Sequence, residues 1–190
     1  MAEHIFEILA VTRNSDGTAH IAPMGLRQRG ELWLLAPFRP SRTLDNLLRE
    51  RCVSVNASDD VRIYAGSLSG HRDWPVAACR QIDGFRLTEA LSHRELVVER
   101  VDDDRTRPAF FCRCVAEQNH RPFAGYNRAQ AAVLELAILV SRLDRLPADK
   151  LDAELAYLQI AIDKTAGERE RTAWDWLMQR VNEHRERHCA

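Results

Sequence analysis

Two short segments in the N-terminal half carry residue types suited to binding a phosphorylated heterocycle. The first ends a strand-like stretch with Ala22, Pro23, Met24 and Gly25. Pro23 lacks a backbone donor and stiffens the chain, whereas Gly25 permits close approach of the backbone. We therefore expect backbone N–H and C=O groups of this segment to pair with the edge of a flat ring. We expect Phe38 to cover one face of that ring.

The second segment, Ser41-Arg42-Thr43, opens a predicted helix. A helix N-terminus offers free N–H groups and partial positive charge, which together favour a phosphate. Ser41 and Thr43 add hydroxyl donors, and the Arg42 guanidinium adds a bidentate fork. Asn46 lies one turn further and is in register to reach a phosphate or ribityl oxygen. The two segments together predict a site for flavin mononucleotide (FMN).

Each segment also has a plainer interpretation. Ser-Arg-Thr is a common start for a solvated helix, and Ala-Pro-Met-Gly is also compatible with a bulge in an edge strand. The order of the elements favours the flavin interpretation, because a hairpin and a third strand lead directly into the basic helix start. The turn of the hairpin is marked by Asp16-Gly17.

The hydrophobic pattern predicts the elements that position these segments. Alternating or continuous apolar runs indicate β-structure over the first 117 residues, and Ser41 is predicted to cap a short helix at 43–50. Residues 67–82 show no clear pattern. The predicted strands are 5–12, 18–26, 31–36, 52–57, 85–88, 95–102 and 110–117.

The pattern changes to helix after residue 126. We predict helices at 128–145, 148–164 and 168–186, with Pro147 breaking the first from the second. This change predicts two domains, a β-domain at 1–120 and a three-helix C-terminal extension at 121–190.

Other chemistry-bearing residues favour structural roles. Glu135 in an apolar helix predicts an ion pair with Arg128 or Arg142, buried at the dimer or domain seam, more than a substrate contact. His184 and His188 have metal-ligand spacing but sit in a polar tail, so we expect a solvated end. Cys112 and Cys114 alternate on a strand and are expected to pack. The sequence therefore predicts no metal site.

Bulk properties exclude several classes of function. A net charge of −1 argues against general nucleic-acid binding, and no uninterrupted apolar run is long enough to cross a membrane. Five irregularly spaced cysteines and the absence of a signal-peptide pattern predict a cytoplasmic protein. No nucleophile elbow, Walker loop or dinucleotide glycine motif occurs, so hydrolase, P-loop and Rossmann interpretations lack support.

Taken together, the motifs resemble the FMN-binding split-barrel superfamily and, within it, domain-of-unknown-function family 447. The resemblance implies an α+β fold, a six-stranded split β-barrel with a C-terminal helical extension. It also implies bound FMN and a homodimer with the flavin near the subunit interface. His20, where relatives carry small or amide residues, Asn56, Asn127 and Arg128 join the implied site. The matching stretches are 11–18, 22–25, 37–47, 53–56, 127–129 with Glu135, and 164–169.

The resemblance implies no particular reaction, and the first hypothesis for function is a flavin-dependent oxidoreductase. Hydride would pass between a reduced nicotinamide or deazaflavin donor and a small-molecule acceptor, and no catalytic side chain is predicted. The alternative is a non-catalytic flavin carrier, or a module that binds a pterin or another phosphorylated heterocycle. A role in one-carbon, methanopterin-linked metabolism follows from the resemblance alone.

Overall fold

The computed structural model describes residues 4–189. Residues 1–3, which the signal-peptide prediction used, lie outside this range. The chain divides into two compact units that interleave along the sequence. The first unit runs to Ser58 and resumes at Trp74–Phe123, and the second comprises Asp59–Asp73 and everything from Ala124 onward. Each unit is described separately below.

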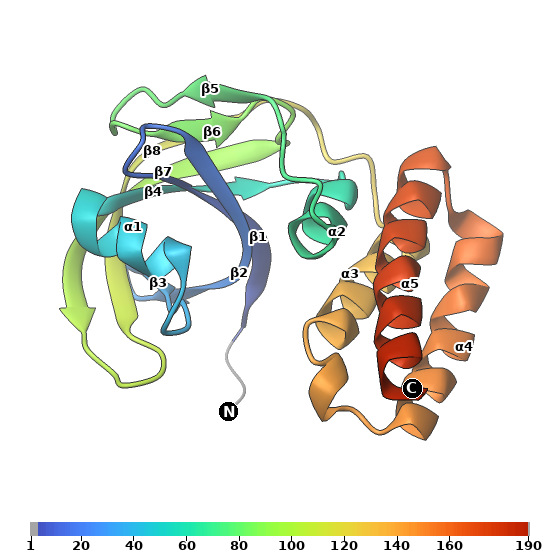
Figure 1. Ribbon diagram of the computed structural model, residues 1–190. Helices are drawn as coiled ribbons and strands as arrows, with labels where there is room; N and C mark the ends of the chain where they lie inside the picture. Colours follow the sequence, from blue (N-terminus) through green and yellow to red (C-terminus); the bar gives the residue numbers. More distant parts are fainter. Residues whose placement is uncertain (1–3, 190) are drawn as a thin grey trace. The chain divides into compact units, whose positions relative to one another are not determined.

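The first unit is built around a closed, antiparallel barrel of six strands in the order β1-β2-β3-β8-β7-β4 (Figure 1). This confirms the predicted α+β barrel fold. Leu26, Leu35 and Phe110 are fully buried in its core, and Leu47 of helix α1 (Arg42–Glu50) belongs to the same apolar cluster. The strands are β1 (Phe6–Arg13), β2 (Ala19–Arg29), β3 (Leu32–Leu35), β4 (Cys52–Ala57), β7 (Ser92–Asp102) and β8 (Ala109–Asn119).

Strand β2 is paired along both edges over only part of its length. Residues Ala19–Leu26 align with β1, so one edge is covered over this part of the strand. The other edge meets β3 only from Leu26 onward. Among the described residues, the Ala19–Gly25 half of β2 therefore has no strand on its second edge. An unpaired edge presents backbone donors and acceptors that a ligand can use.

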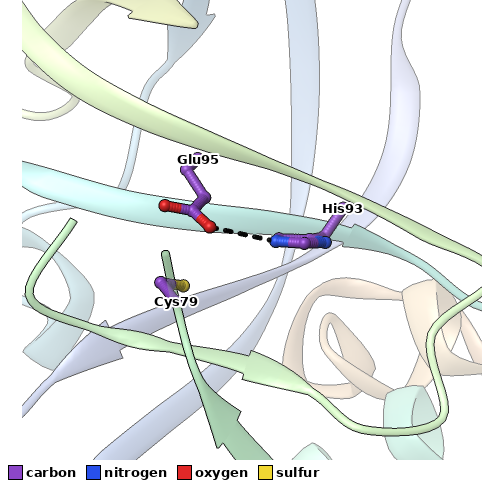
Figure 2. Close-up of side chains that lie close together, drawn as sticks. All are labelled: Cys79, His93 and Glu95. Atoms are coloured by element: carbon purple, nitrogen blue, oxygen red, sulfur yellow. Dashed lines mark hydrogen bonds and ion pairs between the residues drawn. The ribbon is translucent and has the colours of Figure 1, made fainter. Parts of the chain in front are cut away.

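A short hairpin of β5 (Val76–Ala78) and β6 (Phe85–Leu87) lies between β4 and β7 in the chain and forms a separate two-stranded sheet. The loop joining them is anchored by Glu95 of β7, whose carboxylate accepts N–H bonds from Arg80, Gln81 and Ile82 at 2.8, 2.6 and 3.0 Å. His93 lies beside Glu95 on the same face of β7 (Figure 2). Strand β7 begins earlier than predicted. The prediction missed its start because the first buried residues of the strand, His93 and Glu95, are polar.

The second unit is helical. Ala65, Val133, Leu155 and Leu177, one from each of its long helices, share one buried cluster. Helix α2 was not predicted, and the first predicted C-terminal helix ends at Val140 rather than residue 145. No helix within residues 4–189 has the length and apolar character needed to cross a bilayer. The helices are α2 (Arg62–Ser69), α3 (Arg128–Val140), η1 (Leu143–Arg145), α4 (Ala148–Thr165) and α5 (Glu168–Cys189).

Candidate functional site

The start of α1 presents several hydrogen-bond donors without a protein partner. Ser41 is the N-cap, as predicted, and its Oγ accepts the Leu44 N–H at 3.3 Å. This leaves the Ser41 hydroxyl hydrogen free to donate to a ligand. Within the described part of the chain, no partner is recorded for the Arg42 and Thr43 amides. The Arg42 side chain is exposed and likewise forms no hydrogen bond there.

The Arg42 guanidinium faces the turn between β1 and β2. Two hydrogen bonds from Thr18 are the main reason that the pKa of Asp16 lies below its ordinary value, and the charge of Arg42 lowers that pKa further. Arg42 is therefore close enough to Asp16 for an electrostatic effect but is not committed to an ion pair. A solvated guanidinium at a helix start is well suited to a phosphate.

A direct contact joins the helix start to the unpaired half of β2. His20 Nε2 lies 3.2 Å from Thr43 Oγ1, and Thr43 is buried. His20 precedes the Ala22–Gly25 segment on the same strand, so the contact brings together the two segments that sequence analysis paired. The predicted ring-edge and phosphate-binding segments are thus neighbours in the barrel unit.

The Ala22–Gly25 segment, which is predicted to meet the edge of the ring, contains both exposed and partly buried residues. Pro23 is exposed and aligns with Leu9 of β1, whereas Ala22 and Met24 are partly buried. A Cβ atom on Gly25 would lie 2.8 Å from Ile5 Cγ2. The contact with Ile5 therefore already explains why a residue without a side chain stands at this position. Close approach of a ligand at Gly25 stays a prediction.

The predicted ring-covering residue lies on the surface. Phe38 is 60% exposed, and the Arg107 guanidinium lies over its ring at 4.6 Å from the centroid. This arrangement is a cation–π contact, which holds the aromatic ring in place at the loop before α1. Phe38 is therefore available to cover a ligand, but nothing in the barrel orients it toward one.

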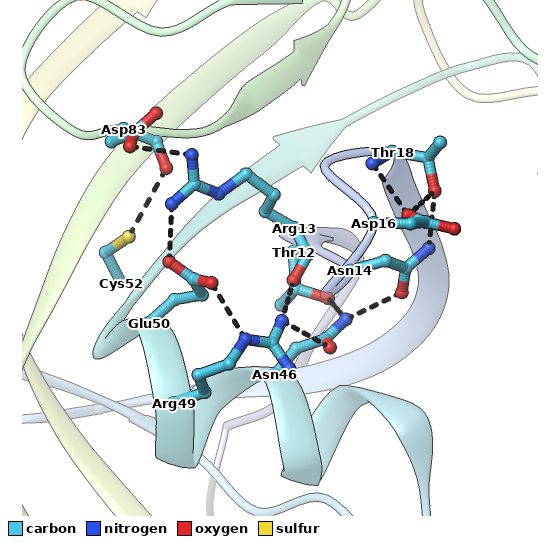
Figure 3. A network of polar contacts seen from close by, with 10 residues as sticks. All are labelled: Thr12, Arg13, Asn14, Asp16, Thr18, Asn46, Arg49, Glu50, Cys52 and Asp83. Carbon is cyan, nitrogen blue, oxygen red and sulfur yellow. Dashed lines mark hydrogen bonds and ion pairs between the residues drawn. The ribbon is translucent and has the colours of Figure 1, made fainter.

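Asn46 belongs to a polar network that ties α1 to the β1–β2 turn (Figure 3). Its Nδ2 donates to Thr12 Oγ1 and to Asn14 Oδ1, both at 3.0 Å. Its Oδ1 accepts from Arg49 Nη2 at 3.0 Å, and the residue is 2% exposed. Binding of a phosphate or ribityl oxygen by Asn46 would require one of these bonds to break. The geometry assigns Asn46 to positioning the helix start.

A second part of this network lies at the other end of α1. Arg13 forms ion pairs with Glu50 at 2.8 Å and with Asp83 at 2.7 Å (Figure 3). Hydrogen bonds from Arg13 and then Arg49 hold the pKa of Glu50 below its ordinary value. Sequence reasoning missed these residues, because ion pairs between distant segments leave no local pattern.

The other predicted site residues have structural partners. Asn56 is fully buried. Its Nδ2 donates to Leu9 O and Ser54 Oγ, and its Oδ1 accepts the Leu87 N–H at 3.0 Å. Asn127 caps α3 in the helical unit, accepting N–H bonds from Ala129 and Gln130. The contribution of Asn127 and Arg128 to the site stays a prediction.

Within residues 4–189 of a single chain, Glu135 forms no ion pair with Arg128 or Arg142. Glu135 and Arg128 are both exposed, and they line a groove of about 300 Å³ between α3 and α4. The helix buries Ala129, Ala132, Val133 and Leu136 instead, which places Glu135 on its outer surface. A pair of Glu135 with an arginine at a subunit seam stays a prediction.

The donor set at α1 fits a phosphate dianion. It comprises two backbone amides, the Ser41 hydroxyl and the Arg42 guanidinium, in line with the macrodipole of a nine-residue helix. The adjacent half-open edge of β2 adds backbone groups that could pair with a heterocycle. The arrangement can bind and orient a phosphorylated ring compound, and it presents no nucleophile among these residues.

Comparison with solved structures supports the same fold. An FMN-bound protein from Methanosarcina mazei, of family DUF447, matches with a TM-score of 0.79 and 19% identity, covering 94% of this chain and 96% of that one. A 2-nitrobenzoate 2-nitroreductase from Pseudomonas fluorescens matches at 0.54 and 22% identity, covering 63% and 66%. The styrene monooxygenase flavin reductase from Pseudomonas putida S12 matches at 0.50 and 14% identity, covering 60% and 81%.

No curated protein matches the chain. Family comparison is more informative. Residues 6–121 match the description "Protein of unknown function (DUF447) N-terminal domain", and residues 127–179 match "Protein of unknown function (DUF447)". The two matches are consecutive and together span most of the sequence. The chain therefore belongs to the DUF447 family of proteins of unknown function.

Proposed function

We propose that this protein binds FMN at the junction of α1 and the half-paired strand β2. Arg42 carries the proposal, because it is an exposed guanidinium without a hydrogen-bond partner in the described residues, at a helix start with two free amides. The FMN-bound Methanosarcina relative supports the identity of the ligand. Ser41, Arg42 and the two amides would hold the phosphate, and the Ala22–Gly25 backbone would meet the ring edge.

We propose further that the protein is a flavin-dependent oxidoreductase. FMN, when bound, supplies hydride transfer to and from its ring system. The chain would bind the phosphate, orient the ring and stabilise the charge that develops near it on reduction, without an obligatory nucleophile. The donor would be a reduced nicotinamide or deazaflavin, and the acceptor a small molecule. The flavin reductases among the structural neighbours support this class.

The second candidate is a non-catalytic flavin carrier, or a module for a pterin or similar phosphorylated heterocycle, possible in methanopterin-linked one-carbon metabolism. Its support is that the described site offers binding groups only, with His20 engaged by Thr43 and no side chain placed as an acid, base or nucleophile. Anaerobic addition of NADH or NADPH separates the candidates. Loss of the yellow colour supports the oxidoreductase, and persistence of the colour supports the carrier or a different donor.

A titration tests the binding site directly. Replacing Arg42 by Gln removes the charge-assisted phosphate contact, and we expect FMN affinity to fall by roughly ten- to a hundredfold. Arg113→Gln is the matched control, because Arg113 is an exposed arginine of the barrel that pairs with Glu99 at the surface. Unchanged affinity in Arg42→Gln, measured by fluorescence quenching of FMN, would refute the site. Absence of any FMN binding or thermal stabilisation by FMN would reject both flavin candidates.

We also propose a homodimer in the cytoplasm. The helical unit exposes Tyr157 (73%) and Ile160 (47%) beside the groove that Arg128 and Glu135 line. A two-fold interface over this face would cover the apolar side chains and let the opposite charges of two copies pair. Within the described residues Cys52, Cys79, Cys112 and Cys114 are free thiols, in keeping with a reducing compartment.

A further inference from the structure

Three metal-ligating side chains converge in the barrel unit, apart from the proposed flavin site. His93 and Glu95 stand two residues apart on β7 and so share a face, and Cys79 directly follows β5 (Figure 2). Their ligand atoms all lie within 4.8 Å of one another. His93 and Glu95 are 3% and 1% exposed, respectively. Polar groups are rarely buried so deeply unless each has a partner.

The carboxylate of Glu95 has one acceptor position that no backbone N–H group occupies. A carboxylate offers about four lone-pair sites. Arg80 N–H occupies one on Oε1, and Gln81 and Ile82 N–H occupy two on Oε2. The remaining position on Oε1 faces His93 Nε2. The backbone bonds thus fix the carboxylate while leaving one lone pair directed at the cluster.

The separation of His93 Nε2 and Glu95 Oε1 fits two ligands of one ion. It is 3.3 Å, longer than the usual 2.7–2.9 Å of a charge-assisted hydrogen bond. Two donors about 2.0–2.1 Å from a tetrahedral ion lie roughly 3.4 Å apart. The observed distance is therefore suited to metal coordination without movement of either side chain.

His120 provides the outer partner that a metal-binding histidine requires. Its Nε2 lies 2.9 Å from His93 Nδ1, and the two rings are stacked. With His93 protonated at Nδ1 and donating to His120, the lone pair on Nε2 points toward Glu95 and Cys79. Metal-bound histidines commonly donate their second N–H to such a partner, which fixes the tautomer and the ring orientation.

We propose that Cys79, His93 and Glu95 bind a divalent ion of the zinc class, with His120 as the positioning residue for His93. The mixed sulfur, nitrogen and oxygen donors favour Zn²⁺ over Mg²⁺ or Ca²⁺. Three protein ligands leave the fourth coordination position for water. Water can reach this position from the side of Cys79, because that residue is only partly buried. The ion would tie the β5–β6 loop to β7. On binding, Zn²⁺ displaces the thiol proton to solvent and the thiolate becomes a ligand.

Burial of Cys79 agrees with a thiol that ionises only when a metal binds. Burial, followed by the nearby Glu95 charge, raises its pKa to about 12, so the thiol is neutral at physiological pH without an ion. A coordinated divalent ion reverses this preference. The cysteine is thus protected from oxidation chemistry, which requires a thiolate.

Metal binding to the full-length, chelator-treated protein tests the proposal. We expect Zn²⁺ to bind with about one-to-one stoichiometry in competition with a chromophoric chelator. Co²⁺ should give tetrahedral visible bands together with a sulfur-to-cobalt charge-transfer band. Cys79→Ser should abolish the charge-transfer band, and His120→Ala should weaken Zn²⁺ binding by about ten- to a hundredfold.

Two controls isolate the site. Cys114→Ser removes another half-buried thiol of the barrel, one that donates to Ala116 O, and should leave the Co²⁺ spectrum unchanged. A His184→Ala/His188→Ala variant removes the cluster of Asp144, His184 and His188, which contains no sulfur and in which His184 is partly buried. Binding that survives Cys79→Ser but is lost in this variant would overturn the proposal.

If the Cys79→Ser variant fails to fold, the unmodified protein still tests the proposal. There, the absence of a sulfur-to-cobalt band, or of a rise in melting temperature with Zn²⁺, would also overturn the proposal. The FMN titration is independent of these results, because none of the four residues belongs to the proposed flavin site.

Discussion

Arg42 and Asn46 stand one turn apart on α1 and show two different uses of a polar side chain. Arg42 is exposed and has no hydrogen-bond partner in the described chain, so its charge is available to a ligand. Asn46 is buried and bonds to Thr12, Asn14 and Arg49, so its amide fixes the position of the helix. The residue proposed to bind phosphate and the residue that positions the helix are therefore separable by mutation.

Asp60 in the helical unit provides a prediction about pH. Its carboxylate accepts two bonds from the Arg62 guanidinium, at 2.9 and 2.6 Å, and one from the Arg62 backbone. Burial acts to raise its pKa, but the Arg62 bonds and the charges of Arg62 and Arg169 together hold it below the ordinary value of 3.8. The ionised form thus stabilises the fold above about pH 4, and this stabilisation is lost as pH falls through the folded-state pKa.

We expect Asp60→Asn to lower the free energy of unfolding by about 1–3 kcal/mol at neutral pH, because Arg62 loses its charged partner. The difference from the unmodified protein should shrink as the pH approaches 3. Urea denaturation at a series of pH values measures both effects. Asp73→Asn, at an exposed position, is the control, and a deficit that stays constant down to low pH would contradict the argument.

At the scale of the element, the two ends of α1 are fixed by its capping residues. Ser41 caps its N-terminus, and Arg51 closes its C-terminus in the left-handed region with φ of 58°. Arg51 is the one described non-glycine residue with positive φ. Its backbone N–H still reaches Leu47 O at 3.1 Å, so the helix ends with its carbonyl satisfied. A side chain at this position carries a conformational cost that glycine avoids.

We therefore expect Arg51→Gly to be more stable than Arg51→Ala by about 0.5–1 kcal/mol, after allowance for the greater entropy of unfolded glycine. Both variants lose the long bond from Arg51 Nη2 to Val98 O, so the comparison isolates the backbone. Thermal unfolding of the two proteins in parallel gives the difference. Equal stability would mean that the left-handed conformation costs little here.

Elements with a regular apolar pattern were predictable from the sequence. The strands of the barrel and the helices α1, α4 and α5 begin and end within a few residues of their predicted bounds. Helix α2 was not predicted, since Ile63, Tyr64 and Ala65 are consecutive buried residues rather than a helical stripe, and no side chain caps its start. The start of strand β7 at Ser92 was missed, because its buried His93 and Glu95 look like surface residues in the sequence.

The candidate site was predictable only where its signal is local. A helix cap followed by an arginine, and a proline near a glycine in a strand, can be read along the chain. The contact of His20 with Thr43, or of Asn46 with Thr12, joins residues more than 20 positions apart and depends on how the barrel closes. The metal-ligating cluster has the same origin, since Cys79 lies in the loop after β5 whereas His93 lies on β7.

At the scale of the whole molecule, two units interleave along one chain. The sequence suggested a single change from strand to helix near residue 120, whereas Asp59–Asp73 packs with the helices that follow Ala124. The chain thus enters the helical unit, returns to the barrel and leaves it again. Such crossing connections link the folding of the two units, because neither is complete until both segments of its sequence have formed.

The proposed homodimer leads to a test at this scale. We expect Ile160→Asp to shift the protein from dimer to monomer, because a charge would be buried against the apolar face of α4. Gln159→Asp introduces the same charge about 100° around the helix from Ile160, outside the residues that line the groove, and should leave the dimer intact. Light scattering after size exclusion reports the mass. A monomeric unmodified protein, or a dimer unaffected by Ile160→Asp, would exclude this interface.

The half-paired strand β2 also bears on solubility. An open strand edge is a template on which another chain can add by backbone pairing, and it can therefore start aggregation. Pro23 stands in the middle of the open half and contributes no N–H group. The same residue that stiffens the strand for a ligand thus interrupts the ladder that a foreign strand would need, so the barrel can keep an edge open without becoming a nucleus for fibrils.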